Sequence, residues 1–141
     1  MNKDVLFENE RDLLSFLRKR SESCLFSEIC GLVGINKEKK IIYREMPNRS
    51  QKPEQIFIID AYDYLNFISE NEAFCVFHSH LHGDEEPSDF DIKTSENCCY
   101  LFLIYSINTE KFFLYEPKDK DYDVNIAKGI RSILNEHKNL R

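Results

Sequence analysis

Hydrophobic residues recur along the chain with two different periods, and the period separates expected helices from expected strands. In residues 8–21, three leucines form a stripe among charged residues, which predicts an amphipathic helix. Residues 29–35 and 99–107 carry no charge and are rich in apolar side chains, which predicts buried strands. Residues 73–77 have the same character, predict a further strand and lead directly into a histidine-rich segment.

Weaker versions of these patterns, separated by turn residues, complete the expected elements. Further strands are expected at 40–46, 55–59 and 111–115, and further helices at 60–70, 88–97 and 122–137. The helix that starts at Asp60 is expected to turn Tyr64, Leu65 and Ile68 inward. The last helix has as its apolar residues Val124, Ile126, Ile130, Ile133 and Leu134. Together these elements predict an α/β (α+β) domain, with a single mixed sheet of about six strands flanked by three or four helices.

Length and charge narrow the classes of protein that remain. The 141 residues suit one domain over residues 1–141, without an internal repeat or a long linker. With 19 basic and 25 acidic residues the net charge is −6, which argues against a nucleic-acid partner. No apolar run approaches the ~20 residues of a membrane span, so no membrane contact is expected. The N-terminus does not have the pattern of a signal peptide.

The five cysteines are an odd number without a C-x-x-C pair, which fits neither a secreted disulfide framework nor a zinc ribbon. We therefore expect a reducing, cytoplasmic setting. One bridge from Cys75 to Cys98 or Cys99 stays open, since their strands could be neighbours. Cys30 lies in an apolar strand without an activating partner and is interpreted as a core residue.

The segment with the most chemistry begins where the strand 73–77 ends. His78 and His80 are two residues apart, so on an extended strand both imidazoles point to the same side and can reach one metal. Asp91 follows eleven residues later, in an expected helix, and can add an oxygen ligand. Two histidines and one carboxylate suit a catalytic zinc whose fourth position is left for water, and such a water has a pKa of about 7.

Hydrolysis also needs a group that takes a proton from the water and passes it to the leaving amine. Glu28 directly precedes the buried strand 29–35. A carboxylate at the start of such a strand can be held rigidly at the edge of the core. Glu28 is therefore the candidate general base.

The spacing of these residues resembles that of a known family. His78 and His80, then seven residues, then Ser88 and Asp91 reproduce the pattern His-x-His, Ser-x-x-Asp of the JAMM (MPN-plus) zinc metalloproteases. Glu28 and the strand after it are similar to the family's first strand. The resemblance implies one zinc per chain, held by the two histidines and the aspartate. It also implies that Glu28 is general base and acid and that Ser88 donates a hydrogen bond to the oxyanion.

The resemblance extends over about residues 20–116 and implies an MPN/cytidine-deaminase-like fold. Pro47-Asn48 and residues 57–60 are similar to the family's intervening strand and helix start. Leu81 stands where many relatives carry proline, which leaves the conformation of that loop open. The chain lacks the long insertions of eukaryotic members and is more similar to compact prokaryotic forms.

The function that the resemblance implies is hydrolysis of the amide bond after the C-terminus of a ubiquitin-like protein. Compact bacterial members of this deubiquitinase-like kind occur in antiviral defence systems such as CBASS. Two alternatives stay open: trimming of a sulfur-carrier protein in cysteine or cofactor biosynthesis, and a non-catalytic interaction module. The expected partners are ubiquitin-like or sulfur-carrier proteins and their conjugates. The oligomeric state stays open.

Each residue also has a plainer interpretation. An isolated His-x-His pair is most often two ordinary histidines at a strand end, and Ser88 with Asp91 could be only a capping box. Glu28 alone would most often be a surface carboxylate. His82 shares the strand parity of the histidine pair, but it lies where the strand is expected to have ended. A cupin-like site with Glu85 in place of Asp91 is a further alternative, and the joint spacing favours the JAMM-like set.

Overall fold

The computed structural model describes residues 4–119 and 124–139, which form one mixed β-sheet flanked by helices. The strands are β1 (Asp4–Phe7), β2 (Cys30–Ile35), β3 (Ile41–Met46), β4 (Glu72–His80), β5 (Leu101–Ser106) and β6 (Lys111–Tyr115). The helices are α1 (Glu10–Glu22), α2 (Ala61–Glu70), α3 (Asp89–Cys98) and α4 (Val124–Asn139). This is the expected α+β class.

The sheet is open, with the strand order β1-β3-β2-β4-β5-β6. Within the described ranges, β4 and β5 form its one parallel pair, and the other neighbouring strands are antiparallel. A parallel pair needs a crossover connection, which the loop after β4 and helix α3 supply. The end of β4, where both histidines lie, is therefore the point at which the chain leaves the sheet for α3.

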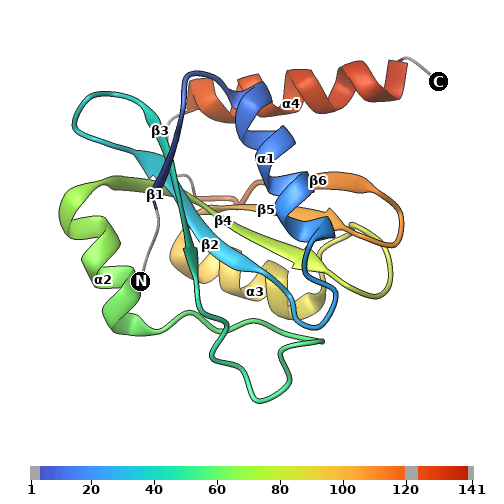
Figure 1. The fold of residues 1–141 in the computed structure, drawn as a ribbon. Coiled ribbons are helices and arrows are strands. Elements are labelled where there is room, and N and C mark those ends of the chain that lie inside the picture. The colour runs from blue at the N-terminus through green and yellow to red at the C-terminus, as the bar shows by residue number, and fades with distance from the viewer. Residues whose placement is uncertain (1–3, 120–123, 140–141) are drawn as a thin grey trace.

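Helices cover both faces of the sheet (Figure 1). Helices α1 and α4 pack on one face, over a core that includes Leu13, Leu17, Phe77, Tyr105 and Ile130. Helices α2 and α3 lie on the other face, over a smaller buried set that includes Cys30, Val76, Phe67 and Phe102. The candidate catalytic residues lie at one end of this second, thinner layer.

Local sequence explains where three of the helices begin. Side-chain oxygens of Asn9, Asp60 and Ser88 accept hydrogen bonds from backbone N–H groups in the first turns of α1, α2 and α3. These helices begin and end within two residues of the expected positions. In α4, Ile130 is buried, and Ile126, Ile133 and Leu134 pack partly buried against the same core, as the pattern predicts. Residues 122 and 123 and the side chain of Val124 lie outside the described part of the chain.

The strand expected at 55–59 is wrong, and β1 takes its place in the count of six. Residues 56–60 belong to no strand of the described sheet. The reason is that the side chain of Asn48 replaces a strand partner: it accepts a hydrogen bond from Ile58 N and donates one to Ile56 O, each at 3.1 Å. The four residues of β1 were too short a pattern to predict from sequence.

Helix α2 turns a different face to the sheet from the one its apolar residues predict. Phe67 is fully buried and Tyr64 is partly buried, whereas Leu65 and Ile68 are 54% and 37% exposed. The expectation that Leu65 and Ile68 face inward is therefore wrong. The helix contacts the sheet along one narrow stripe, so only residues spaced three apart on that stripe are covered.

The cysteines are free thiols, and the bridge left open by the sequence is not formed. Cys75 lies within β4, Cys98 ends α3, and Cys99 follows in a left-handed conformation. Cys30 is fully buried, as expected of a core residue, and burial raises the pKa of its thiol to about 12. Such a thiol is unreactive at neutral pH.

None of the helices in the described ranges has both the length and the apolar character needed to cross a bilayer.

Candidate active site

The end of β4 presents two histidines to the face covered by α2 and α3. Side chains alternate along a strand, so His78 and His80 share a side with the core residue Val76. His78 is fully buried: its ring stacks on Phe57, with centroids 4.4 Å apart, and meets Phe102 edge-on at 5.6 Å. His80, two residues closer to the end of the strand, is partly exposed. The expected parity of the pair is confirmed.

Asp91 reaches the same point from the first turn of α3. Ser88 Oγ accepts a hydrogen bond from Asp91 N at 3.1 Å, and Asp91 Oδ2 accepts one from Ser88 N at 3.0 Å. These two bonds form the capping box considered from the sequence. The box does not compete with a ligand role, because the same Oδ2 also faces both histidines. Instead, it fixes the orientation of the carboxylate.

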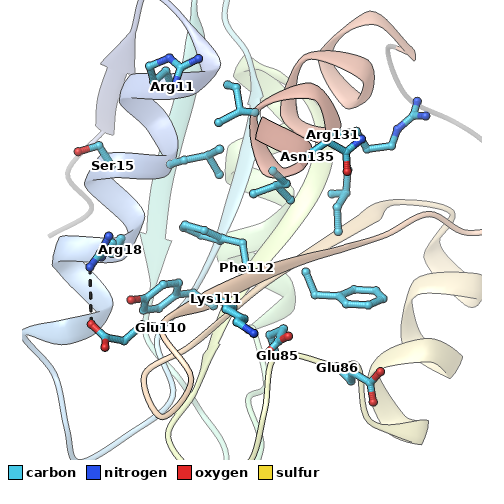
Figure 2. A pocket seen from close by; sticks show the side chains of 16 residues that line it. Arg11, Ser15, Arg18, Glu85, Glu86, Glu110, Lys111, Phe112, Arg131 and Asn135 are labelled. Carbon is cyan, nitrogen blue, oxygen red and sulfur yellow. Dashed lines mark ion pairs between the residues drawn. The ribbon is translucent and has the colours of Figure 1, made fainter. Parts of the chain in front are cut away.

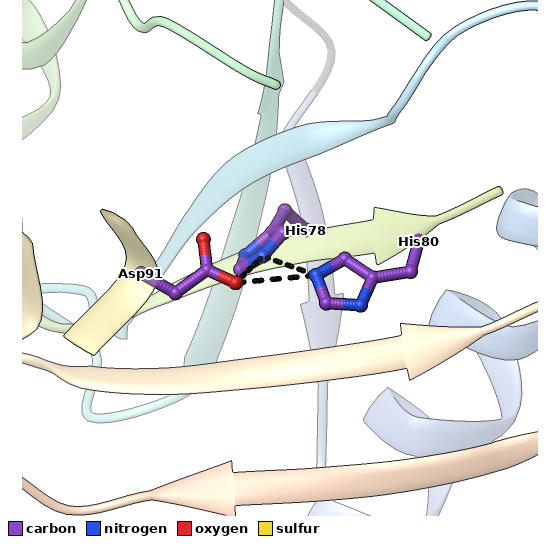
Figure 3. A group of neighbouring side chains, drawn as sticks. All are labelled: His78, His80 and Asp91. Atoms are coloured by element: carbon purple, nitrogen blue, oxygen red, sulfur yellow. Dashed lines mark hydrogen bonds and ion pairs between the residues drawn. The ribbon is translucent and has the colours of Figure 1, made fainter. Parts of the chain in front are cut away.

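Figure 3 shows the three side chains converging on a single point. His78 Nε2 lies 3.1 Å from Asp91 Oδ2, His80 Nε2 lies 3.2 Å from that oxygen, and the two Nε2 atoms are 3.2 Å apart. The ligands of a tetrahedral zinc, each ~2.0–2.1 Å from the metal, are separated by about 3.3 Å. The near-equilateral triangle of donor atoms therefore fits three corners of such a site.

Protons satisfy this triangle only if both rings donate to the same carboxylate oxygen. An ionised carboxylate only accepts hydrogen bonds, and a neutral imidazole has one nitrogen that donates and one that accepts. If one Nε2 carries a proton, the other, bare Nε2 faces the carboxylate oxygen with lone pair against lone pair. If both carry protons, both N–H groups point to that one oxygen. A cation at the centre satisfies all three atoms at once.

The Nδ1 atoms of the two rings differ in their hydrogen-bond partners. His80 Nδ1 lies 2.8 Å from the backbone carbonyl oxygen of Asp84, which can only accept a hydrogen bond. His80 Nδ1 therefore carries the proton, and the lone pair of its Nε2 is available to a metal. His78 Nδ1 is buried and has no hydrogen-bond partner among the described residues. The aromatic stack with Phe57 orients the His78 ring instead.

Burial and hydrogen bonding oppose each other in setting the charges of the cluster. Burial lowers the pKa of His78, which favours the neutral imidazole. Burial alone would raise the pKa of Asp91, but hydrogen bonds with the two histidines outweigh it and hold that pKa below its usual range. Burial likewise opposes the charge of His80, yet Asp91 and the Asp84 carbonyl raise its pKa. A bound cation would reverse this last effect, because it would replace the proton beside Asp91.

Glu28 lies two residues before the neighbouring strand β2, opposite His80. The antiparallel ladder pairs Cys30 of β2 with His78 of β4, and continuing that register places residue 28 across from residue 80. Both side chains line the same cleft. Glu28 is only 6% exposed, and burial raises the pKa of its carboxyl to about 7. Such a pKa suits a group that takes up and releases a proton near neutral pH.

Ser79, between the two histidines, ties their strand to the strand of the candidate base. Its Oγ accepts a hydrogen bond from Ile29 N at 2.8 Å, and its own N–H donates to Ile29 O at 2.9 Å. Ser79 is fully buried, so water does not compete for these bonds. Because Ile29 follows Glu28, the two bonds fix the spacing between Glu28 and the histidines.

A cleft of about 510 Å³ opens over the cluster. Its lining residues come from the segment before β2, the loop 50–58, the end of β4 with the loop after it, and the start of α3: Glu28, Lys52, Glu54, Gln55, Ile56, His80, His82, Ser88, Phe90 and Asp91. Ser88 Oγ accepts its hydrogen bond from the backbone of Asp91, so its own O–H is left to donate into the cleft. An oxyanion donor requires such a free hydroxyl.

Two alternative ligands do not join the triangle. His82 lies on the exposed loop after β4 and lines the cleft outside the metal-binding group. The Glu85 carboxylate accepts a hydrogen bond from Thr109 Oγ1 at 2.7 Å and also lies outside that group. The cupin-like alternative, which required Glu85 in place of Asp91, is therefore wrong.

Sequence reasoning missed the residues that support the site from behind. Phe57 was assigned to a strand, and Asn48 had no role beyond the resemblance. Ser79 had no predicted role. Asp84 acts through its backbone carbonyl, so no sequence signal could have found it. For the other three, the contacts depend on which strands are neighbours.

Comparisons with known proteins bear on the fold. No protein-family model matches the chain, and no curated protein matches it in sequence. Among solved structures, the chain is similar to the solution structure of protein DSY2949 from Desulfitobacterium hafniense, with a TM-score of 0.58 and 21% sequence identity. That match covers 79% of this chain and 84% of the other. At this identity the likeness supports the fold alone, and function has to be argued from the site.

Proposed function

We propose that the protein is a zinc-dependent isopeptidase or peptidase that hydrolyses the amide bond after the C-terminus of a ubiquitin-like protein. The observation that carries the proposal is the convergence of three donor atoms in a cleft that also holds a buried carboxyl with a raised pKa. A metal site alone could serve structure or binding. Glu28 adds the proton carrier that hydrolysis requires, which favours an enzyme over a non-catalytic module of the same fold.

His78, His80 and Asp91 are the residues that would hold the metal, and their donor set is typical of catalytic zinc. A zinc ion bound there supplies Lewis acidity and lowers the pKa of water. Glu28 accepts the proton of the attacking water on a carboxylate oxygen and then donates it to the leaving amine nitrogen. A pKa of about 7 lets one group perform both steps. Ser88 O–H donates a hydrogen bond to the substrate carbonyl oxygen as it gains negative charge.

The size of the cleft favours a substrate that enters as a narrow, extended segment. Its volume of about 510 Å³ holds a few residues, whereas a folded domain would have to stay outside it. The flexible C-terminal tail of a ubiquitin-like protein meets this requirement. The tail's identity rests on the JAMM resemblance, as do the proposed cytoplasmic setting and the link to a bacterial antiviral conjugation system.

The first test measures zinc in the full chain, purified without chelators. Wild type is expected to hold about one zinc per chain, and Asp91→Ala and His80→Ala are expected to lose it. Asp89→Ala is the matched control, since Asp89 is an exposed carboxylate in the same helical turn. A stable wild-type protein without zinc would favour a non-catalytic interaction module.

The second test measures cleavage. Probes are ubiquitin-like and sulfur-carrier proteins, each joined through its C-terminal glycine to an amide-linked fluorophore. Wild type is expected to release the fluorophore from ubiquitin-like probes, and Glu28→Ala is expected to keep zinc and lose this activity. Equal cleavage by both would exclude Glu28 as the base. Cleavage of sulfur-carrier probes alone would keep the chemistry and move the substrate to the biosynthetic class.

A further inference from the structure

We propose that Asn48 is the positioning residue of this site: one side-chain amide holds both the backbone of the base Glu28 and the segment that carries Phe57. The part of the inference that concerns catalysis rests on the proposed function. The contacts themselves are independent of it.

The amide nitrogen of Asn48 joins two segments that flank the cleft. Nδ2 donates hydrogen bonds to the carbonyl oxygens of Glu28 and Ile56, each at 3.1 Å. A third carbonyl, of Pro53, lies 3.4 Å from the same nitrogen. An amide nitrogen has two N–H donors, so both are used by backbone groups next to the site.

The amide oxygen of Asn48 organises the loop 50–58 from the inside. Oδ1 accepts hydrogen bonds from Ser50 N and Ile58 N, each at 3.1 Å. Backbone N–H groups only donate and carbonyls only accept, so the orientation of the amide is unambiguous. With two donors and two acceptor lone pairs in use, the side chain has no capacity left for solvent.

The base has little other backbone support. Strand β2 begins at Cys30, so Glu28 lies before the regular ladder. Its N–H donates to Pro53 O at 2.6 Å, within the loop that Asn48 organises, and its carbonyl accepts from Asn48 Nδ2. Both backbone groups of Glu28 therefore depend on Asn48, one directly and one through the loop.

The same amide also supports a metal-site histidine. Phe57 lies between Ile56 and Ile58, whose backbone groups are both bound by Asn48. The Phe57 ring stacks on His78 at 4.4 Å between centroids. A single side chain thus sets the position of the base on one strand and the ring behind a ligand on the next.

The hydrogen-bond partners of Asn48 require a side chain that both donates and accepts, which an amide does. Aspartate has nearly the same shape, but it would place a second oxygen against the carbonyls of Glu28 and Ile56. Alanine would leave the same carbonyls and the N–H groups of Ser50 and Ile58 without their partner. Both changes should displace Glu28 without altering any of the three donor residues.

The experiment compares Asn48→Asp and Asn48→Ala with Ser50→Ala. Ser50 is the matched control because its Oγ accepts a hydrogen bond from Lys52 N at 3.0 Å in the same loop, away from Glu28. For cleavage of the fluorophore probe, both Asn48 variants are expected to lower kcat about 10- to 100-fold, with KM changed by less than about twofold. Zinc content should match wild type, and Ser50→Ala should match wild type throughout.

Amide hydrogen exchange at Glu28 and Ile58 supplies a readout that does not depend on activity. Both amides are expected to exchange faster in the Asn48 variants and at the wild-type rate in Ser50→Ala. Unchanged kcat with intact zinc would overturn the proposal, and so would a kcat that falls only in proportion to lost zinc. If wild type cleaves no probe, the proposed function fails while exchange still decides the positioning: unchanged protection of Glu28 would overturn it. Asn48→Ala introduces no charge and serves if the aspartate variant does not fold.

Discussion

Two hollows among the described residues differ in size and in chemistry, and the larger one brings together fewer groups that could bind a metal or carry a proton. The groove between α1, α4 and the edge strand β6 has a volume of about 760 Å³, against about 510 Å³ for the cleft over the histidines (Figure 2). The arginines of the groove are in exposed ion pairs: Arg18 with Glu110 at 3.6 Å, Arg11 with Glu136 at 2.9 Å and Arg131 with Glu116 at 2.9 Å. Among the residues that line the cleft, by contrast, Glu28 and Asp91 are only 6% and 3% exposed.

The two hollows differ in how their polar groups are matched. An exposed ion pair contributes only ~0–1 kcal/mol and leaves both groups free to be solvated. The buried hydroxyl of Tyr105 in the groove donates to Glu22 Oε2 at 2.6 Å, so it is already satisfied. The donor atoms of His78, His80 and Asp91, by contrast, converge within reach of one metal ion. Buried polar groups that converge on one point, rather than volume, identify the candidate site.

The largest effect is expected from removing a corner of the triangle. Asp91→Ala should abolish zinc binding and lower cleavage by about 10³-fold or more, because the metal contributes several kcal/mol of charge stabilisation. Metal analysis and probe cleavage measure the two losses. The exposed Asp89→Ala should keep both, and an Asp91→Ala variant with full zinc would contradict the assigned ligand set.

The next largest effect is expected at the base. Glu28→Gln should keep zinc and lower kcat/KM about 10²- to 10⁴-fold, since it removes the proton carrier. In wild type the rate should rise with pH through about 7, as the Glu28 carboxyl ionises. A pH series of kcat/KM checks both statements. A glutamine variant that keeps the same rising limb would assign the titration to another group.

Substitutions of Ser88 test whether a residue that caps a helix also acts on the substrate. Ser88→Ala should lower kcat about 10²-fold by loss of the oxyanion donor, and should cost about 1 kcal/mol of stability by loss of the cap. Ser88→Gly separates the roles, because glycine caps helices almost as well but has no hydroxyl. Steady-state kinetics and thermal unfolding of both variants decide the matter. A glycine variant with wild-type kcat would restrict Ser88 to capping.

Burial of Glu28 has a cost that depends on pH. The folded state raises the carboxyl pKa from 4.5 to about 7, so folding favours the protonated acid. Below about pH 4 both states are protonated and the pKa difference has no effect, whereas above pH 7 the fold must hold a buried negative charge. In chelator-treated protein, Glu28→Gln should therefore be about 1–3 kcal/mol more stable than wild type at pH 8–9 and equal to it near pH 4. Urea unfolding at both pH values measures this, and a pH-independent difference would argue against burial as the cause.

The smallest effects are expected in the groove. Arg131 pairs with Glu116 at 2.9 Å, and its side chain is 43% exposed. Arg131→Ala should change stability by less than about 0.5 kcal/mol and leave zinc content and cleavage as in wild type. Unfolding, metal analysis and probe cleavage are the measurements. If Arg131→Ala lost cleavage but kept zinc, the groove would take part in substrate binding, and the contrast between the groove and the cleft would be wrong.

Most of the helices and strands could be predicted because their signals are local. Asp60 and Ser88 mark helix starts by capping, and the apolar runs 29–35 and 99–107 mark the central strands. The strand predicted at 55–59 is wrong, because an apolar run does not show whether its backbone hydrogen bonds go to another strand or to a side-chain amide. The prediction of which α2 side chains face the sheet was wrong for a related reason. The spacing of apolar residues alone does not distinguish Leu65, which is exposed, from Phe67, which is buried.

The sequence by itself determined which side chains can converge. The parity of His78 and His80 follows from strand geometry, and the place of Asp91 follows from the first turn of a helix capped by Ser88. Only the tertiary structure decided what surrounds them. The pairing of β2 with β4 places Glu28 opposite His80, and burial there raises its pKa to about 7. Parity and capping depend on a few neighbouring residues, whereas strand pairing and burial depend on residues some fifty positions away, as with Ile29 and Ser79.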